Sequence, residues 1–196
     1  MASPSNKGIG HIGIISEDST DFETIRILIS KIVDTDGIGF KSKVGNGCAK
    51  IRSKCVAWAQ DLKNRKCDIL IVVHDLDRND HKKLKAELTS KLSLSAIRNN
   101  LVCIPVEEIE AWLIADPIGI KTSLGLKRIP RFSGNPETIT SPKEKLREAI
   151  FQCSGKEIFY QTSINPRIAG SIDISLVYNK CPSFKEFYDY IKTNVS

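Results

Sequence analysis

Carboxylates follow three apolar segments of this chain, at points where each segment ends. These carboxylates are Glu17, Asp75, Asp77, Glu108 and Glu110. Acidic side chains that share one site repel one another unless a cation neutralises them or their pKa values rise. Mg²⁺ is typically held by a few carboxylates together with water and substrate phosphate. The pattern therefore predicts a site for Mg²⁺ or Mn²⁺, provided that the fold brings the three segment ends together.

The elements that must position these acids alternate along the chain. Segments rich in apolar and β-branched residues predict strands at 9–16, 38–44, 69–73 and 101–106. Apolar residues at helical spacing lie between them, and we expect a further helix over 107–115. Such alternation predicts an α/β fold, in which a parallel, Rossmann-like sheet carries helices on both faces. Ligands of such sheets bind beyond the carboxyl ends of the strands, where the acids fall.

The pattern changes after residue 117. Residues 118–140 contain several Gly and Pro residues, which predicts a loop, and three helices should then begin at Ser141-Pro142, Asn165-Pro166 and Pro182-Ser183. We therefore expect an α/β core over 8–117 and a mostly helical C-terminal extension over 118–196 that packs on it. Capping boxes are predicted at Thr20-x-x-Glu23 and at Ser141-x-x-Glu144.

Basic charge is concentrated in one part of the chain. The segment 41–66 carries eight basic residues and one acid, whereas the whole chain has a net charge of +6. A solvated helix face and a nucleic-acid footprint are both consistent with this block. On the second interpretation the candidate phosphate contacts are Lys41, Lys43, Lys50, Arg52, Lys54, Lys82 and Lys83.

Composition excludes several classes of protein. The chain has 196 residues, 41% of them hydrophobic and 27% charged, which is typical of a folded domain and not of a disordered protein. It has no apolar run long enough to span a bilayer, no secretory signal pattern at Met1, no paired cysteines at zinc-ribbon spacing and no P-loop motif. We expect a cytoplasmic protein that does not bind membranes, and its oligomeric state, including a homo-oligomer, stays open.

The acidic motifs resemble the TOPRIM domain of topoisomerases, primases and several nucleases. Glu17 is followed by Asp21, and the hydrophobic-Asp75-Leu76-Asp77 motif comes 58 residues after Glu17. The stretch Glu107-Glu108-Ile109-Glu110-Ala111-Trp112-Leu113-Ile114-Ala115-Asp116 is similar to a motif of small stand-alone TOPRIM-like proteins, catalogued as a domain of unknown function. Those proteins often neighbour ATPases in bacterial defence loci. Segments 142–146 and 181–185 resemble later motifs of that family.

The resemblance implies roles for individual residues. Glu17, Asp75 and Asp77 would be metal ligands, with Asp21 beside them, and Glu17 would also transfer a proton. By similarity to the overcoming-lysogenisation-defect nucleases, Glu108 or Glu110 would complete a second metal site, and Lys143 would act near the scissile phosphate. Helix spacing alone places Glu107 and Glu110 on one face, so the choice among Glu107, Glu108 and Glu110 stays open.

The function implied is metal-assisted hydrolysis of DNA or RNA, in antiviral defence with an ATPase partner. One departure from the TOPRIM pattern is Asp18, which stands where the family usually has Gly and is expected to restrict the turn. Two alternatives remain open. The first alternative is a non-catalytic TOPRIM-like binding subunit of an ATPase complex. The second is a phosphoryl-transfer protein that uses the DxD motif.

Overall fold

A sheet of four parallel strands lies at the centre of the computed structural model, which describes residues 8–195. The strands, in the spatial order β2-β1-β3-β4, are β1 (His11–Ser16), β2 (Gly39–Val44), β3 (Ile69–Val73) and β4 (Asn99–Cys103). Their register pairs Ser16 with Val44 and Val73 with Cys103, so the carboxyl ends of the strands share one edge of the sheet. This confirms the predicted α/β fold with a parallel sheet.

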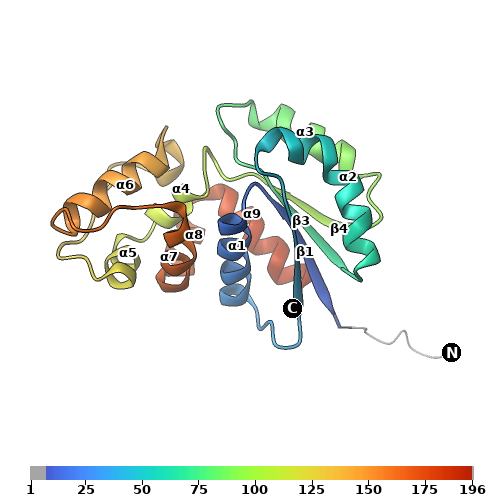
Figure 1. The fold of residues 1–196 in the computed structure, drawn as a ribbon, viewed down its shortest axis with the longest axis horizontal. Coiled ribbons are helices and arrows are strands. Elements are labelled where there is room, and N and C mark those ends of the chain that lie inside the picture. The colour runs from blue at the N-terminus through green and yellow to red at the C-terminus, as the bar shows by residue number, and fades with distance from the viewer. Residues whose placement is uncertain (1–7, 196) are drawn as a thin grey trace.

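Helices cover both faces of the sheet (Figure 1). On one face lie α2 (Cys48–Asn64) and α3 (His81–Leu92), whose leucines pack with Leu70 and Val72 of β3. On the other face lie α1 (Ser19–Ile32) and α9 (Pro182–Asn194). All five residues of β3 are buried, as the continuous apolar run predicts for a strand between two helical layers.

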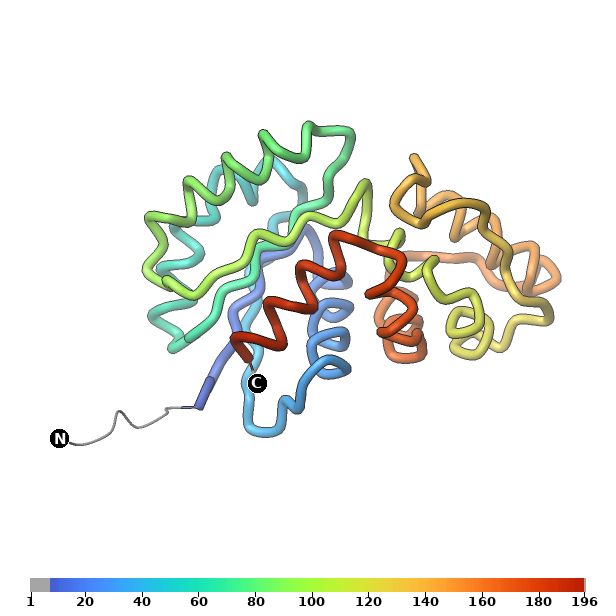
Figure 2. Tube along the Cα trace, turned by 180° about the vertical axis from the view of Figure 1, so that it is seen from behind, coloured from blue at the N-terminus to red at the C-terminus, as the bar shows by residue number. Residues whose placement is uncertain are grey.

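The remaining helices form a lobe at one end of the molecule (Figure 2). They are α4 (Glu110–Ile114), α5 (Pro117–Leu124), α6 (Pro142–Cys153), α7 (Asn165–Ser171) and α8 (Ile174–Lys180), with short 3-10 turns η1 (Pro136–Thr138) and η2 (Thr162–Ile164). The chain then returns through α9 to the sheet. One hydrophobic cluster contains Ile14 of β1 and Ile150 of α6, so the core of the sheet continues into this lobe.

Aromatic residues join the lobe to the sheet. The indole of Trp112 stacks on Phe187 at a centroid distance of 5.7 Å and meets Phe184 edge-on at 5.1 Å. Its Nε1 donates to Ser183 Oγ at 2.8 Å. The apolar stripe of α9 is therefore buried against the core, as its spacing predicts, and Trp112 is a core residue.

Several element boundaries differ from the sequence prediction. Residues 117–124, expected to be loop, form α5, because Asp116 caps the helix start through Ile118 and Gly119 N–H and Gly125 ends it with a φ of 65°. The single helix expected after Asn165-Pro166 is divided into α7 and α8, with Asp173 as the cap of α8.

Both predicted capping boxes were wrong. The box of α1 is formed by Asp18 and Asp21, not by Thr20 and Glu23. Helix α6 does begin at Pro142, but the Ser141 side chain makes no capping hydrogen bond. Among residues 8–195, no helix combines the length and the apolar character needed to cross a lipid bilayer.

Candidate metal centre

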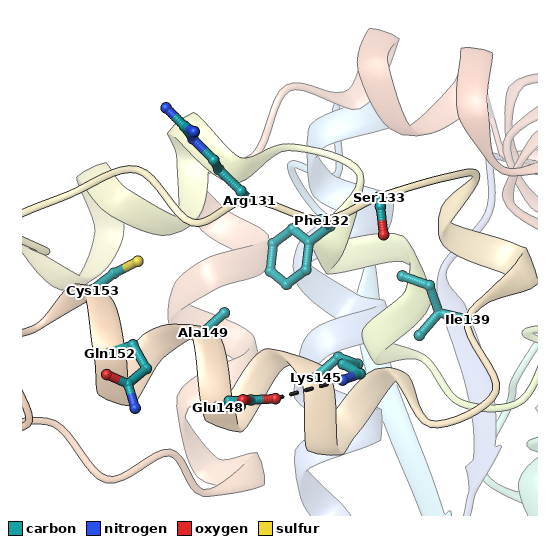
Figure 3. Close-up of a pocket in the computed structure, with 9 residues that line it drawn as sticks. All are labelled: Arg131, Phe132, Ser133, Ile139, Lys145, Glu148, Ala149, Gln152 and Cys153. Carbon is teal, nitrogen blue, oxygen red and sulfur yellow. Dashed lines mark ion pairs between the residues drawn. The ribbon is translucent and has the colours of Figure 1, made fainter.

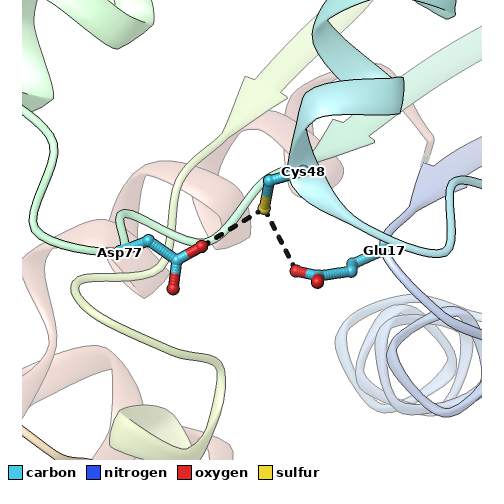
Figure 4. Close-up of side chains that lie close together, drawn as sticks. All are labelled: Glu17, Cys48 and Asp77. Carbon is cyan, nitrogen blue, oxygen red and sulfur yellow. Dashed lines mark hydrogen bonds between the residues drawn. The ribbon is translucent and has the colours of Figure 1, made fainter.

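Two of the predicted ligands meet a cysteine at the carboxyl edge of the sheet (Figure 4). The Cys48 thiol donates to Glu17 Oε2 at 3.1 Å and to Asp77 Oδ2 at 3.4 Å. One ligand atom from each of the three residues lies within 4.8 Å of the other two. Glu17 comes from the end of β1 and Asp77 from the loop after β3, so residues distant in sequence share one small volume.

The turn between β2 and α2 places Cys48 beside Glu17. Gly45 N donates to Ser16 O at 2.9 Å, and Asn46 N donates to Glu17 O at 2.8 Å. A Cβ at Gly45 would lie 3.0 Å from Gly47 O, and the φ of Gly47 is 127°, so glycine is required for this tight path. Helix α2 then begins at Cys48, which faces the end of β1. No spacing rule in the sequence selects Cys48, and the sequence prediction missed it.

The loops after β3 and β4 hold each other by backbone hydrogen bonds. Leu76 N donates to Pro105 O at 3.2 Å, and Asp77 N donates to Glu107 O at 3.3 Å. Asp77, Arg78 and Glu107 have φ values of 47°, 62° and 59°. Left-handed backbone is costly for residues other than Gly and Asn, and it concentrates at functional sites. The backbone that carries the Asp77 carboxylate is therefore held by the loop that follows β4.

A second group of carboxylates lies deeper, beneath the first. Burial raises the pKa of Asp21 to about 7, with further repulsion from Asp18, Glu110 and Glu17. Burial also raises the pKa of Asp75 well above its ordinary value, and the charges of Asp21 and Glu110 add to this effect. The structure therefore brings Asp21, Asp75 and Glu110 within electrostatic reach of one another and of Glu17.

Glu110 is held by two partners from the helical lobe. Its side chain is only 3% exposed, and its Oε1 accepts hydrogen bonds from Tyr160 Oη at 2.7 Å and from Asn165 Nδ2 at 3.0 Å. Tyr160 Oη also lies 2.6 Å from Asn165 Oδ1. Burial, followed by the charge of Glu110, raises the pKa of the Tyr160 hydroxyl. Tyr160 and Asn165 are supporting residues that the sequence prediction missed.

Glu108 lies at the rim, where α6 begins. Its Oε2 accepts a hydrogen bond from Lys143 N at 3.0 Å, and burial raises its pKa while this bond and the Lys143 charge oppose the rise. A hollow of about 200 Å³ opens here, lined by Asp77, Arg78, Glu107, Glu108, Thr140, Ser141 and Glu144. The expected shared helix face of Glu107 and Glu110 is wrong, because α4 begins only at Glu110.

Asp18 has a structural task at the start of α1. Its Oδ1 accepts hydrogen bonds from Thr20 N at 2.7 Å and from Asp21 N at 2.9 Å, and Asp21 Oδ2 accepts from Asp18 N at 3.3 Å. Its φ of −135° is extended backbone that any residue adopts. The expected restriction of the turn by Asp18 is therefore absent.

His74 is buried between β3 and the Asp75 loop. It is 1% exposed, and its Nδ1 lies 2.6 Å from Asp75 O. This contact fixes the imidazole against the backbone that carries Asp75, which is the structural role that its place at a strand end predicts.

The basic residues of the predicted nucleic-acid footprint divide into two sets. Lys43 pairs with Asp61 at 2.9 Å, and Arg52 pairs with Glu87. Hydrogen bonds from Arg52 and Lys91 lower the pKa of Glu87 to about 2. These cations are partly neutralised within the molecule, and Lys41 is half-buried on edge strand β2. The exposed members without an ion pair among the described residues are Lys50, Lys54, Lys82 and Lys83. Of these, Lys50, Lys82 and Lys83 lie in the first turns of α2 and α3, which begin at the acidic edge.

Comparison with known proteins identifies the family of this chain. No curated protein and no solved structure matches the chain significantly. A family described as "Domain of unknown function (DUF4276)" matches residues 16–192. The match covers strands β2 to β4, the helical lobe and every carboxylate of the site, from Glu17 to Glu110, while β1 lies before it except for Ser16. The chain therefore belongs to the DUF4276 family.

Proposed function

We propose that this chain is a Mg²⁺- or Mn²⁺-dependent nuclease of TOPRIM type that hydrolyses phosphodiester bonds of nucleic acid. The observation that carries the proposal is the meeting of Glu17 and Asp77 with Cys48 at the carboxyl edge of the sheet, close to the half-buried Asp75. In parallel α/β sheets this edge is where ligands bind.

The donors fit a divalent cation. Oxygen ligands lie about 2.1–2.5 Å from Mg²⁺ or Ca²⁺, so two ligands of one ion are at most about 5 Å apart. The ligand atoms of Glu17, Cys48 and Asp77 lie within 4.8 Å of one another, which satisfies the limit for the longer bonds; Mg²⁺, with bonds of about 2.1 Å, requires its ligands to approach within about 4.2 Å. Burial raises the pKa values of Asp21 and Asp75, and repulsion among the carboxylates adds to the rise; this repulsion is relieved when positive charge enters the cluster.

The residues have distinct tasks in the proposed hydrolysis. A bound divalent cation supplies Lewis acidity, which lowers the pKa of an attacking water and stabilises charge on the phosphate. Glu17 and Asp77 would bind the cation, and Glu17 would accept the proton of the water. Asp75 and Asp21 would set the charge beneath the cation, while Lys143 beside Glu108 would place positive charge at the rim. Lys50, Lys82 and Lys83 would contact phosphates near the cut.

The TOPRIM relationship, the role in antiviral defence and the ATPase partner belong to the same proposal. They are supported by the resemblance of the Glu17, Asp75-x-Asp77 and 107–116 motifs. The parallel sheet with its acids at the carboxyl edge is consistent with that relationship.

Cleavage of labelled DNA and RNA, with Mg²⁺ or Mn²⁺ and with EDTA, tests the proposal. Asp77→Asn keeps the size of the side chain and suits the left-handed backbone, so it removes charge without disturbing the fold. We expect this variant and Glu17→Gln to lose cleavage by at least a hundredfold. The matched control Asp189→Asn, on the exposed side of α9, keeps full activity. Cation binding without any cleavage would favour the non-catalytic binding subunit and contradict the proposal.

A further inference from the structure

The helical lobe carries a basic surface of its own. Residues 118–131 contain Lys121, Lys127, Arg128 and Arg131 and no acid. All four line a hollow of about 790 Å³, together with Ile129 and Cys153. Among residues 8–195, no acidic side chain lines this hollow, so its electrostatic potential is positive.

A second hollow lies between α6 and the loop that carries Phe132 (Figure 3). It has a volume of about 390 Å³ and shares Arg131 and Cys153 with the basic hollow. One wall is a single face of α6, made by Lys145, Glu148, Ala149 and Gln152, and the Phe132 ring projects from the opposite loop toward that face. The two hollows together form one groove, called here the α6 groove.

Three of the five cations of the α6 groove form no ion pair within residues 8–195. Lys127 pairs with Glu157, and Lys145 pairs with Glu148 at 3.5 Å. Neither Lys121 nor Arg131 forms an ion pair with any residue in 8–195. Arg128 is oriented by its Nη2, which donates to Gln152 O at 2.9 Å.

Helix α6 connects this groove to the metal centre. Its first turn lies at Glu108, through the hydrogen bond from Lys143 N, and its last residue is Cys153 in the basic hollow. Its 12 residues span about 18 Å at about 1.5 Å per residue. A stacked strand rises about 3.4 Å per nucleotide, so about five nucleotides cover that span. A mononucleotide or a free phosphate is too short to use the whole groove.

We propose that the α6 groove binds the sugar–phosphate backbone of a single-stranded nucleic acid that continues from the metal centre. The inference rests on the proposed function and names its substrate class. Cations that follow a groove, together with an aromatic ring on which a base stacks, are the features of single-strand binding. A duplex keeps its base faces stacked inside and offers none to Phe132.

Fluorescence anisotropy with labelled dT12, dT4 and a 12-base-pair duplex, all in EDTA, tests the inference. The variant Lys121→Gln/Arg131→Gln removes two cations from the groove. The control Lys63→Gln/Lys192→Gln removes two exposed cations from α2 and α9. We expect the groove variant to weaken dT12 binding at least tenfold and the control less than twofold. The logarithmic salt slope falls by about 1.4 in the groove variant, because each phosphate contact on a single strand contributes about 0.7.

Two further measurements sharpen the result. Phe132→Leu should weaken dT12 binding about tenfold, the loss of one stacked base. Alkylation of Cys153, followed by peptide mass spectrometry, should be slowed by dT12 in the wild type but not in the groove variant, because Cys153 lies in the same hollow as Lys121 and Arg131.

Equal dT12 affinity in the groove variant and its control would overturn the inference, as would a duplex that binds as tightly as dT12. This assay contains no metal and measures no cleavage, so it is independent of the nuclease proposal. If cleavage were lost in Asp77→Asn but unchanged in Lys121→Gln/Arg131→Gln, the inference about the groove would be refuted and the proposed nuclease activity would stand. If dT12 binding depended on Lys121 and Arg131 but no cleavage occurred with a divalent cation, the proposed nuclease activity would be refuted and the inference about the groove would stand.

Discussion

The thiol of Cys48 is the least expected donor at the scale of single residues. It lies between two carboxylates, where burial and its hydrogen bond to Glu17 raise its pKa. A hard cation such as Mg²⁺ prefers oxygen ligands, whereas a soft cation prefers thiolate and displaces its proton. The centre therefore offers different donors to different metals.

This difference predicts a spectroscopic result for Cys48. Addition of Cd²⁺ to the wild-type protein should produce an ultraviolet sulfur-to-cadmium charge-transfer band. Cys48→Ser should abolish the band and keep Mn²⁺ binding within about threefold, because Glu17 and Asp77 remain. Cys55→Ser, on the same helix but buried in the core, is the matched control and should keep the band. A band that survives in Cys48→Ser would place Cd²⁺ elsewhere.

The buried carboxylates predict how stability depends on pH. The pKa of Asp21 is about 7 in the folded protein and near 3.8 when the chain is unfolded, so folding favours the protonated acid. The free energy of unfolding should therefore fall as pH rises from about 4 to about 7, and Asp75 acts in the same direction.

Urea unfolding between pH 4 and pH 8 in EDTA measures this dependence. Asp21→Asn keeps an acceptor for Asp18 N and should flatten the curve, as should saturating Mn²⁺ in place of EDTA, because the cation neutralises the charge of the cluster. Asp36→Asn, at an exposed acid outside the cluster, should leave the slope unchanged. Stability that rises with pH across this interval would contradict the description of the inner carboxylates.

At the scale of elements, the start of α1 shows how a local signal positions the site. Asp18 caps the helix, and the same turn directs Glu17 toward Cys48 and Asp21 toward Asp75. Loss of an N-cap carboxylate costs about 1 kcal/mol. Asp18→Ala should therefore lower the free energy of unfolding by about that amount.

The measurement is best made at pH 5, where Asp21 is protonated and its repulsion from Asp18 is small. Asp189→Ala, within α9, serves as the control and should change stability by less than about 0.5 kcal/mol. An unchanged midpoint for Asp18→Ala would show that the cap does not stabilise α1.

The sequence predicts the strands and the acids at their ends for a clear physical reason. A continuous apolar run such as 69–73 is typical of a strand buried on both faces, and the acids directly follow it. Position along the chain is thus enough to place Glu17, Asp75 and Asp77 at one edge. Helix α5 is not predicted from the sequence, because its Gly and Pro residues indicate a loop. In the structure Pro117 begins the helix and Gly125 ends it.

Contacts between distant segments have no comparable signal in one sequence. Cys48 reaches Glu17 only because the 45–47 turn bonds to the end of β1, and Tyr160 meets Glu110 only after the helical lobe folds back. Which of Glu107, Glu108 and Glu110 share a helix face depends on the residue at which α4 begins. Glu107 has left-handed backbone, and α4 begins only at Glu110. These features are tertiary, so spacing rules do not contain them.

At the scale of the whole molecule, the sheet and the helical lobe share one hydrophobic core. Phe187 of α9 is 1% exposed and stacks on Trp112 of α4. Truncation of a buried Phe costs about 3–5 kcal/mol, so Phe187→Ala should destabilise the whole molecule by that amount. The far-ultraviolet circular dichroism and the tryptophan fluorescence should still change at the same urea concentration.

The matched control for this prediction is Phe159→Ala, because Phe159 is 74% exposed. It should change the free energy of unfolding by less than about 0.5 kcal/mol. If Phe187→Ala unfolded the lobe first and left the sheet intact, the description of a continuous core would be wrong.

The proposed nuclease activity requires a divalent cation that binds at the carboxyl edge of the sheet. Electron paramagnetic resonance of Mn²⁺ titrated into the wild-type protein, Glu17→Gln, Asp77→Asn and Asp189→Asn measures this directly. We expect bound Mn²⁺ in the wild type and in Asp189→Asn, and affinity reduced at least tenfold in Glu17→Gln and in Asp77→Asn. Equal Mn²⁺ affinity in all four proteins, or no bound Mn²⁺ in any of them, would contradict the metal centre.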